Sequence, residues 1–192
     1  MKLACVLIAI LAFSLQITAT AATIDPYIDD FVSFTPGSNT LAPHNEPIEA
    51  FGAPDGGVGA AGGYLSLGNN GEVILEFTDN LLIDGTGFDI RLYEIGDPDP
   101  YTLLISHNNI DYYTVGSGTI SRSFDISSVV TISGQTAFRY VKVIDNNAFH
   151  TPSPFAGTDI DSIEALHTIP IPEPASLALL SLGSLAMIRR RK

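Results

Sequence analysis

The chain contains no tryptophan, two methionines and a single cysteine, Cys5, among its 192 residues. One cysteine cannot form an intramolecular disulfide, so disulfide bonds do not hold this fold together. The absence of tryptophan and of a cysteine pair also removes the two markers of an immunoglobulin-like sandwich. Stability must therefore come from a packed core, with or without a bound metal.

Basic residues are scarce, with nine Lys and Arg against 21 Asp and Glu and a net charge of −12. Five of the nine basic residues lie at the two ends, which leaves four basic and 20 acidic residues elsewhere, a net charge of −16. Phosphate binding needs clustered basic residues, so a nucleic-acid surface is excluded. Two interpretations of the acidity remain: solubility through net repulsion, or binding of a cation such as calcium, which prefers oxygen ligands.

The C-terminus has a three-part pattern. A short motif (Pro172, Glu173, Pro174) precedes the apolar segment Ala175–Ile188, and a basic end follows (Arg189, Arg190, Arg191, Lys192). The apolar segment is shorter than the roughly 20 residues of a stable membrane span, and the basic end favours the cytoplasmic side. The alternatives are a short anchor or a buried C-terminal helix.

This order of features resembles the PEP-CTERM sorting tail of exported bacterial proteins, to which we assign residues 169–192. The resemblance implies an exosortase as the processing partner, a cut near Pro172–Pro174 and a transient inner-membrane intermediate. At the other end, Lys2, the apolar run Leu3–Ile17 and Ala19-Thr20-Ala21 have the layout of a secretory signal peptide, assigned to residues 1–21. We therefore expect an exported protein of the cell surface or extracellular space.

Residues 22–168 are long enough for one domain with its own core. Short β-type runs separated by Gly, Asn and Asp turns predict its strands. These are Glu72–Phe77, Phe88–Tyr93, Tyr101–Ser106, Thr119–Ile126, Ala137–Ile144 and Asp159–Leu166. Alternation in the second strand assigns Phe88, Ile90 and Leu92 to the core. No long segment has a helical period, so we predict an all-β, single jelly-roll-like antiparallel β-sandwich, with residues 35–63 forming long loops.

Several blocks of the body resemble a family of bacterial cell-surface proteins that often carry this tail. They are Phe51–Gly56, Leu65–Gly68, Gly71–Phe77, Gly87–Glu94, Arg139–Asp145 and Gly157–Ala165. The family is similar in layout to discoidin-like and carbohydrate-binding jelly rolls, which implies a surface or matrix role. The chain departs from it at Ser106–Tyr112, where relatives have an Asp-Gly turn; we expect the hairpin to be kept with Asn108-Asn109 as its turn.

Asp159 and Asp161 are two residues apart, so on a strand their side chains project to the same face. Carboxylates that close repel each other unless a cation or hydrogen-bond donors lie between them. We therefore predict a calcium site in which Asp145 and Glu164 complete the oxygen cage. In jelly rolls a calcium ion often ties an early loop to the last strand, which makes Glu49 or Asp55 the early partner. The alternative is that Asp159 caps a turn and Asp161 faces water.

A second acidic stretch, Asp84–Asp89, could be a cation loop, but Asp-Gly is also a common tight turn, and we interpret it as a turn. The candidate ligand-binding residues are Tyr112, Phe149 and Asn146, the aromatic ones offering rings that could stack on a sugar. Their clustering on one rim would favour a lectin-like site. The alternative is that the aromatic residues are ordinary half-buried strand residues.

No catalytic residue is predicted. The four histidines (His44, His107, His150 and His167) do not pair at zinc spacing, and the chain has no nucleophile elbow. We expect a non-catalytic binding or structural protein with calcium-stabilised loops and a polysaccharide partner. The alternatives are a lectin-like carbohydrate-binding module, a hydrolase of surface polysaccharide and a self-assembling matrix protein.

Overall fold

Alternating apolar residues build the central strands of the fold. The strands β3 (Glu72–Glu76), β6 (Tyr101–Ser106) and β10 (Tyr140–Asp145) each bury every second residue over most of their length. Because successive side chains of a strand point to opposite faces, each strand presents one apolar row to the interior. The computed structural model describes residues 25–57, 63–146 and 155–171. The predicted signal peptide, the sorting motif and Phe149 lie outside these residues.

The described residues form three antiparallel sheets. The five-stranded sheet has the order β1-β3-β10-β6-β7, with β1 (Asp30–Thr35) and β7 (Tyr113–Gly118) at its edges. The four-stranded sheet has the order β2-β11-β5-β8, and its strands are β2 (Leu65–Ser66), β11 (Asp159–Ala165), β5 (Ile90–Glu94) and β8 (Arg122–Phe124). The small third sheet contains β12 (Thr168–Pro170), β4 (Asn80–Ile83) and β9 (Ala137–Phe138). The predicted all-β antiparallel class is confirmed.

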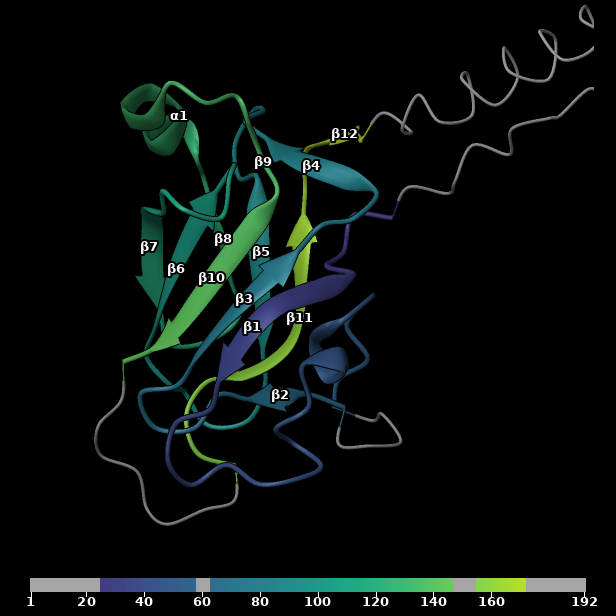
Figure 1. Cartoon of the computed structure of the whole chain (residues 1–192), viewed down its shortest axis with the longest axis vertical. Coiled ribbons are helices and arrows are strands. Elements are labelled where there is room, and N and C mark those ends of the chain that lie inside the picture. Colours follow the sequence, from purple (N-terminus) through teal and green to yellow (C-terminus); the bar gives the residue numbers. More distant parts are fainter. Residues whose placement is uncertain (1–24, 58–62, 147–154, 172–192) are drawn as a thin grey trace, which may run out of the picture.

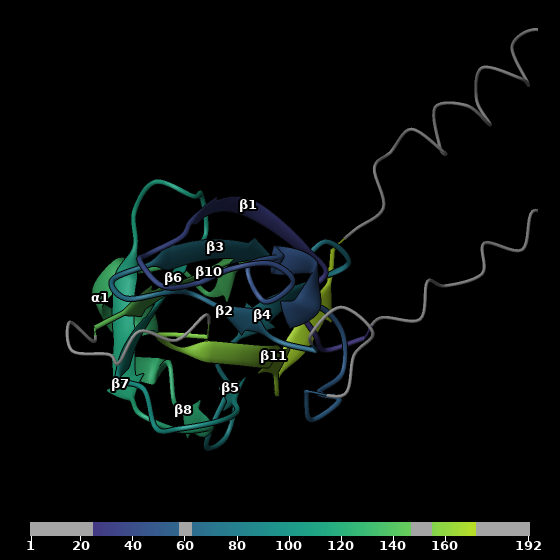
Figure 2. The same ribbon diagram turned by 90° about the horizontal axis from the view of Figure 1, so that it is seen from below.

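The two larger sheets pack face to face (Figures 1 and 2). Val73 and Leu103 come from the five-stranded sheet, Leu92 and Ile163 from the four-stranded sheet, and all four are fully buried in one core. Burying a side chain of this size contributes about 1.5–3 kcal/mol each. The core therefore replaces the disulfides that the sequence lacks.

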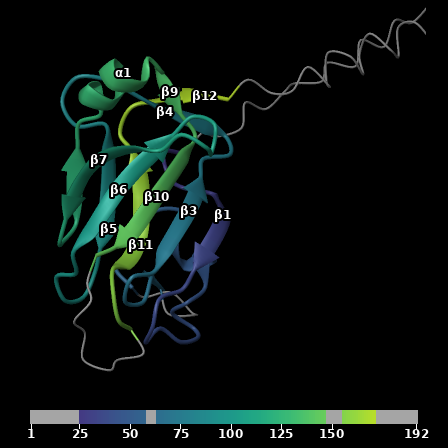
Figure 3. The ribbon, with the colours of Figure 1, turned by 60° about the vertical axis from the view of Figure 1, so that its left-hand side comes forward.

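One end of the sandwich, which we call the tail end, holds both ends of the described body (Figures 1 and 3). The Asp25 amide donates to Asp79 Oδ2 at 3.4 Å, and the Ile171 amide donates to the Asp79 carbonyl at 2.9 Å. The small sheet and the helix α1 (Ser127–Ser133) lie at this end. Gly134 ends α1 in the left-handed conformation, with φ 69°.

The opposite end, which we call the loop end, is formed by residues 36–45, 63–71, 95–100 and 155–158. Backbone hydrogen bonds join these loops: Gly37 donates to the Leu67 carbonyl and Gly68 to the Ala156 carbonyl, both at 2.8 Å. A Cβ on Gly71 would lie 1.9 Å from the Leu67 carbonyl oxygen, so only glycine fits there. The short 3-10 helix η1 (Pro47–Ala50) lies within the long early segment that the sequence predicted as loops.

Four of the six predicted strands match observed strands closely, and two do not. The run Ala137–Ile144 is divided between β9 and β10, which belong to different sheets. In the run Thr119–Ile126 only Arg122–Phe124 is a strand. Phe88 is 60% exposed rather than buried, because β5 begins at Ile90 and Asp89 takes the buried position before it. The hairpin between β6 and β7 turns at Asn109, whose φ is 60°.

The strands β1, β2, β4, β7 and β12 and the helix α1 were not predicted. In β7, Gly116 and Gly118 interrupt the β-type pattern, and α1 contains β-branched residues with low helix propensity. Within the described part of the chain, no helix is long and apolar enough to cross a membrane.

Candidate functional site

Two of the carboxylates that the sequence singled out, Asp145 and Asp159, adjoin the loop end, and each has a different set of partners. Asp145, the last residue of β10, is 2% exposed. Its Oδ1 accepts hydrogen bonds from the Thr158 amide at 2.9 Å and the Thr158 hydroxyl at 3.1 Å, and its Oδ2 accepts from the Asn70 amide at 2.9 Å. Asp145 therefore ties together two loops that are far apart in the sequence.

Asp161 fastens the early loop to the last long strand. Its two carboxylate oxygens accept hydrogen bonds from the backbone amides of Asp55 and Gly56, each at 3.2 Å. Beside it the Ser162 hydroxyl donates to the Gly52 carbonyl at 2.6 Å. Burial raises the pKa of Asp161, and the two amide donors oppose that rise. At the place where the sequence predicted a calcium bridge, direct hydrogen bonds join the loop to the strand.

Asp159 does not share these donors, because the register of β11 against β5 shifts between Ile160 and Ser162. The Ser66 hydroxyl donates to Asp159 Oδ1. Burial raises the pKa of Asp159 to about 7; the Ser66 hydrogen bond opposes that rise, and the negative charges of nearby aspartates add to it. These are Asp99, Asp145 and Asp97. Asp159 is therefore a buried carboxylate among other carboxylates.

Glu94, at the end of β5, is the residue that the sequence reasoning missed. The inward row of β5 runs Ile90, Leu92, Glu94, so the strand places a carboxylate where an apolar residue is expected. Glu94 is 7% exposed, and its Oε1 has no hydrogen-bond partner among the described residues. Burial raises its pKa to about 8, with further contributions from the charges of Asp159, Asp99 and Asp97. The predicted strand ended at Tyr93, and the available signal was that its alternation, continued by one residue, places Glu94 on the inward face.

The remaining predicted metal ligands, Glu164, Glu49 and Asp55, accept hydrogen bonds from other parts of the chain. Glu164 accepts a hydrogen bond from the Tyr93 hydroxyl at 2.6 Å, and this hydrogen bond raises the pKa of Tyr93 to about 12, with burial adding to the rise. Glu49 Oε2 accepts from the Gly63 amide at 2.9 Å. Asp55 accepts from the Gly57 amide at 3.0 Å. Each of the six predicted carboxylates thus accepts at least one hydrogen bond from the protein itself. Their role as calcium ligands stays a prediction.

At the tail end, Asp84, Asp89 and Asp125 form the group of three acidic side chains with ligand atoms within 4.8 Å of one another. Asp89 is fully buried and accepts three hydrogen bonds. They come from the Gly85 amide at 2.7 Å, the Ile126 amide at 2.9 Å and His167 Nδ1 at 2.9 Å. This saturation by protein donors fits the interpretation of Asp84–Asp89 as a structural turn.

The candidate ligand-binding residues Tyr112 and Asn146 lie at opposite ends of the β6–β10 pair. Asn146 follows Asp145, which pairs with Tyr101 at the start of β6, while Tyr112 lies beyond Ser106 at the other end of β6. The Tyr112 hydroxyl donates to Asn109 Oδ1 at 2.6 Å. The two residues therefore do not form one rim, and Phe149 lies outside the described residues.

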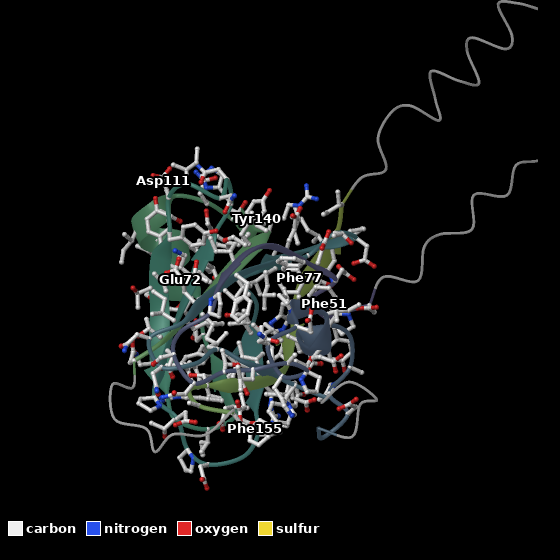
Figure 4. All side chains as sticks on the ribbon, turned by 60° about the horizontal axis from the view of Figure 1, so that its bottom comes forward. Phe51, Glu72, Phe77, Asp111, Tyr140 and Phe155 are labelled. Atoms are coloured by element: carbon white, nitrogen blue, oxygen red, sulfur yellow. The ribbon has the colours of Figure 1, made fainter. Side chains whose placement is uncertain are left out.

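A different aromatic group lies at the loop end. The ring of His44 is 4.4 Å from that of Tyr64 and 4.3 Å from that of Phe155, measured between centroids. Phe155 is 43% exposed and projects at the loop end (Figure 4). Tyr64 directly precedes β2, whose Ser66 hydroxyl donates to Asp159. Burial raises the pKa of Tyr64, and the charge of Asp159 adds to that rise. These three residues come from three different loops, so no short sequence pattern could have predicted that they lie together.

Comparison with solved structures gives low similarity. The C-terminal domain of a chitobiase from Bacteroides fragilis shares 13% identity with a TM-score of 0.43, over 73% of this chain and 93% of that chain. The protein CpGH89CBM32-4, produced by Clostridium perfringens, shares 12% identity with a TM-score of 0.44, over 73% of this chain and 96% of that chain. The comparison with curated proteins gives no match.

Residues 170–192 match the family model described as the PEP-CTERM protein-sorting motif. This agrees with the pattern of a Pro-Glu-Pro motif, an apolar segment and a basic end. The motif implies processing by exosortase, a membrane enzyme. The chain therefore carries a PEP-CTERM sorting signal and is an exported surface protein that reaches the cell surface through a membrane-associated step.

Proposed function

We propose that this protein is a non-catalytic binding protein of the cell surface, and that its loop end recognises an extracellular polysaccharide. The observation that carries the proposal is the separation of the two ends. The sorting motif begins at residue 170, and Asp25 and Ile171 both contact Asp79 at the tail end. Figure 3 shows the loop end at the opposite end of the sandwich from β12, so a membrane or processing enzyme engaged by the tail would leave the loop end facing outward.

The chemistry of the loop end supports a sugar as ligand. Phe155 and Tyr64 supply partly exposed aromatic rings, and aromatic residues give large contact areas at little cost in conformational entropy. Asn146, also at this end, adds an exposed amide, which both donates and accepts hydrogen bonds. The net charge of −12 disfavours polyanionic ligands, so a neutral polysaccharide is the proposed class.

A hydrolase is the second candidate function, favoured by the two buried carboxylates Glu94 and Asp159. A glycosidase needs one protonated and one ionised carboxyl group at the same pH. Here burial raises the pKa of Asp159 to about 7 and that of Glu94 to about 8, so neither is firmly ionised at neutral pH. The inward position of Glu94 in β5 also keeps it away from a large substrate. These observations support binding rather than catalysis.

Calcium stabilisation of the loops is a further part of the proposal. The body is strongly acidic, and calcium ions take carboxylate and carbonyl oxygens as ligands. A cation that binds only the folded form raises stability by mass action, by about 2.7 kcal/mol at a hundred times its Kd.

The test of the polysaccharide proposal is retention of the full chain, purified in mild detergent, on insoluble neutral polysaccharides. Phe155→Ala is expected to weaken binding at least ~10-fold, equivalent to about 1.4 kcal/mol. Phe88→Ala is the matched control. Phe88 is also an exposed phenylalanine, but it lies just before β5, at the end of that strand far from the loop end. Equal affinities for the two variants, or no retention of the wild-type chain, would refute the proposed surface. Release of reducing ends from the bound polymer would favour the hydrolase instead.

A further inference from the structure

A surface pocket lies at the tail end, beside the strand that leads into the sorting tail. It has a volume of about 380 Å³ and is lined by Ile83, Asp84, Val130, Thr136 and Ile169. These residues come from β4 and the turn after it, from α1 and the loop after it, and from β12. The small sheet and the helix, both at the tail end, therefore form the pocket together (Figure 1).

The wall of the pocket that the small sheet supplies is apolar. Burial alternates along β4, so Leu82 faces the core and Ile83 lies on the opposite face of the strand. Ile169 pairs with Leu81 across β12 and β4, which places it on the same face as Ile83, and it is 41% exposed. Val130 of α1 adds a further partly buried apolar side chain. Covering such a surface with an apolar segment is favourable, because it removes apolar area from water.

The charge beside the pocket is negative. Asp84 lines the pocket, and carboxylate oxygens of Asp84 and Asp125 lie within 4.8 Å of each other. Both side chains are exposed, and no basic residue is among the described residues that line the pocket. A second copy of this acidic chain is a poor occupant, because the two bodies repel each other. The pocket instead suits a partner that combines apolar side chains with positive charge.

The sorting tail has this combination, and it starts beside the pocket. Its apolar segment, Ala175–Ile188, is followed by four basic residues at positions 189–192. The Ile171 amide, one residue beyond β12, donates to the Asp79 carbonyl at 2.9 Å and fixes the root of the tail. The apolar segment begins four residues later, a span of at most ~14 Å. A segment tethered this closely has an effective concentration in the millimolar range, so even a weak contact forms.

We propose that the tail-end pocket is a docking site for the chain's own sorting tail. The apolar segment Ala175–Ile188 covers the apolar wall, and the basic end lies near Asp84 and Asp125. The segment is shorter than the roughly 20 residues of a stable membrane span, so docking on the body competes with insertion into the membrane. In the unprocessed chain the body thus shields its own sorting segment from water, and the processing enzyme takes the segment up at the tail end.

The test is intramolecular disulfide formation in the full chain, diluted below the critical micelle concentration of its detergent and oxidised with diamide. Cys5→Ser removes the native thiol, and Leu180→Cys places one in the apolar segment. The second thiol is Thr136→Cys, which lines the pocket, or Thr78→Cys as the matched control. Both threonines are exposed, and Thr78 is next to Asp79 at the root of the tail, so a tail that is only tethered reaches Thr78 at least as easily. Mass spectrometry is expected to show the Thr136 pair forming at least ~5-fold faster.

Three variants connect the crosslink to the pocket. Ile169→Asp puts a charge on the apolar wall and is expected to slow the Thr136 pair to the rate of the Thr78 pair. Ile169→Val is expected to keep the fast rate. Asp84→Asn is expected to slow the reaction at low ionic strength and to have less effect at high salt, because salt screens the attraction to the basic end. A melting temperature within ~5 °C of the parent chain shows that a variant is folded.

Three results would overturn the docking site. Equal rates for the Thr136 and Thr78 pairs would mean that tethering alone brings the tail to the body. Disulfide-linked dimers that increase with protein concentration would assign the pocket to a second copy of the chain. A fast Thr136 pair that Ile169→Asp leaves unchanged would place the segment outside the pocket. None of these results affects the polysaccharide test, which depends on Phe155.

Discussion

The strand β5 has a buried carboxylate at each end, and the two differ in their hydrogen-bond partners. Asp89, just before the strand, is 0% exposed and accepts hydrogen bonds from two backbone amides and His167. Glu94, its last residue, is 7% exposed, lies among other carboxylates and has an oxygen without a partner in the described chain. Burial by itself does not define a role. Three donors make Asp89 a structural anchor, whereas Glu94 is buried with an oxygen that no described donor satisfies.

The largest effect is expected from removing the anchor. Asp89→Ala leaves the Ile126 amide and the Gly85 amide without their acceptor and detaches His167 from the turn. We expect a loss of about 3 kcal/mol in the free energy of unfolding, measured by urea denaturation, since unpaired buried polar groups cost 1–3 kcal/mol each. Asp84→Ala, an exposed neighbour in the same turn, is the control. Equal losses in the two variants would contradict the anchoring role.

An intermediate effect is expected from pH at the other end of β5. In the chelated protein, burial raises the pKa of Glu94 from 4.5 to about 8 and that of Asp159 from 3.8 to about 7. The unfolded chain therefore loses these protons near pH 4–5, while the folded chain keeps them until pH 7–8. Since the folded form binds more protons in this window, stability falls as pH rises from about 5 to 8.

Melting temperatures in chelator, measured across that window, check this prediction. The difference between the wild type and Glu94→Gln isolates the contribution of Glu94: the two are expected to melt similarly at pH 5, with the variant several degrees higher at pH 8. A wild-type advantage that grows with pH would show that a donor or a cation stabilises the ionised carboxylate of Glu94 in the folded chain.

The smallest effect is expected at Asp161. Asp161→Asn keeps one oxygen acceptor but turns an amide NH₂ toward a backbone donor, so one of the hydrogen bonds to Asp55 and Gly56 is lost. We expect about 1 kcal/mol of destabilisation. Hydrogen exchange of the Asp55 and Gly56 amides is expected to quicken while that of β10 amides is unchanged. Unchanged exchange at these two amides would show that Asp161 does not hold the early loop against β11.

Much of the fold could be predicted from alternation alone. Glu72–Phe77 and Tyr101–Ser106 have clear apolar rows, and both form strands as expected. Phe88 was assigned to the core because it fits the same alternation, but the strand begins two residues later. Where strands begin is decided by hydrogen bonds to neighbours, as with Asp89 and the Ile126 amide, and these contacts are distant in sequence.

The candidate site depends on contacts between distant segments more than the fold does. Asp159 was singled out from its spacing to Asp161, but a register shift in β11 gives the two side chains separate partners. Glu94 was overlooked because a glutamate at a strand end is usually exposed. The group of His44, Tyr64 and Phe155 unites three loops, which local patterns do not connect.

The sequence by itself determined the destination of this protein and its all-β class. Both depend on local order: a sorting motif is a linear signal, and strand alternation repeats every two residues. Only the tertiary structure decided which carboxylates have donors and which face one another, because these partners lie up to about a hundred residues apart along the chain, as Asp161 and Asp55 do. The electrostatic contrast between the two ends of β5 therefore arises from packing.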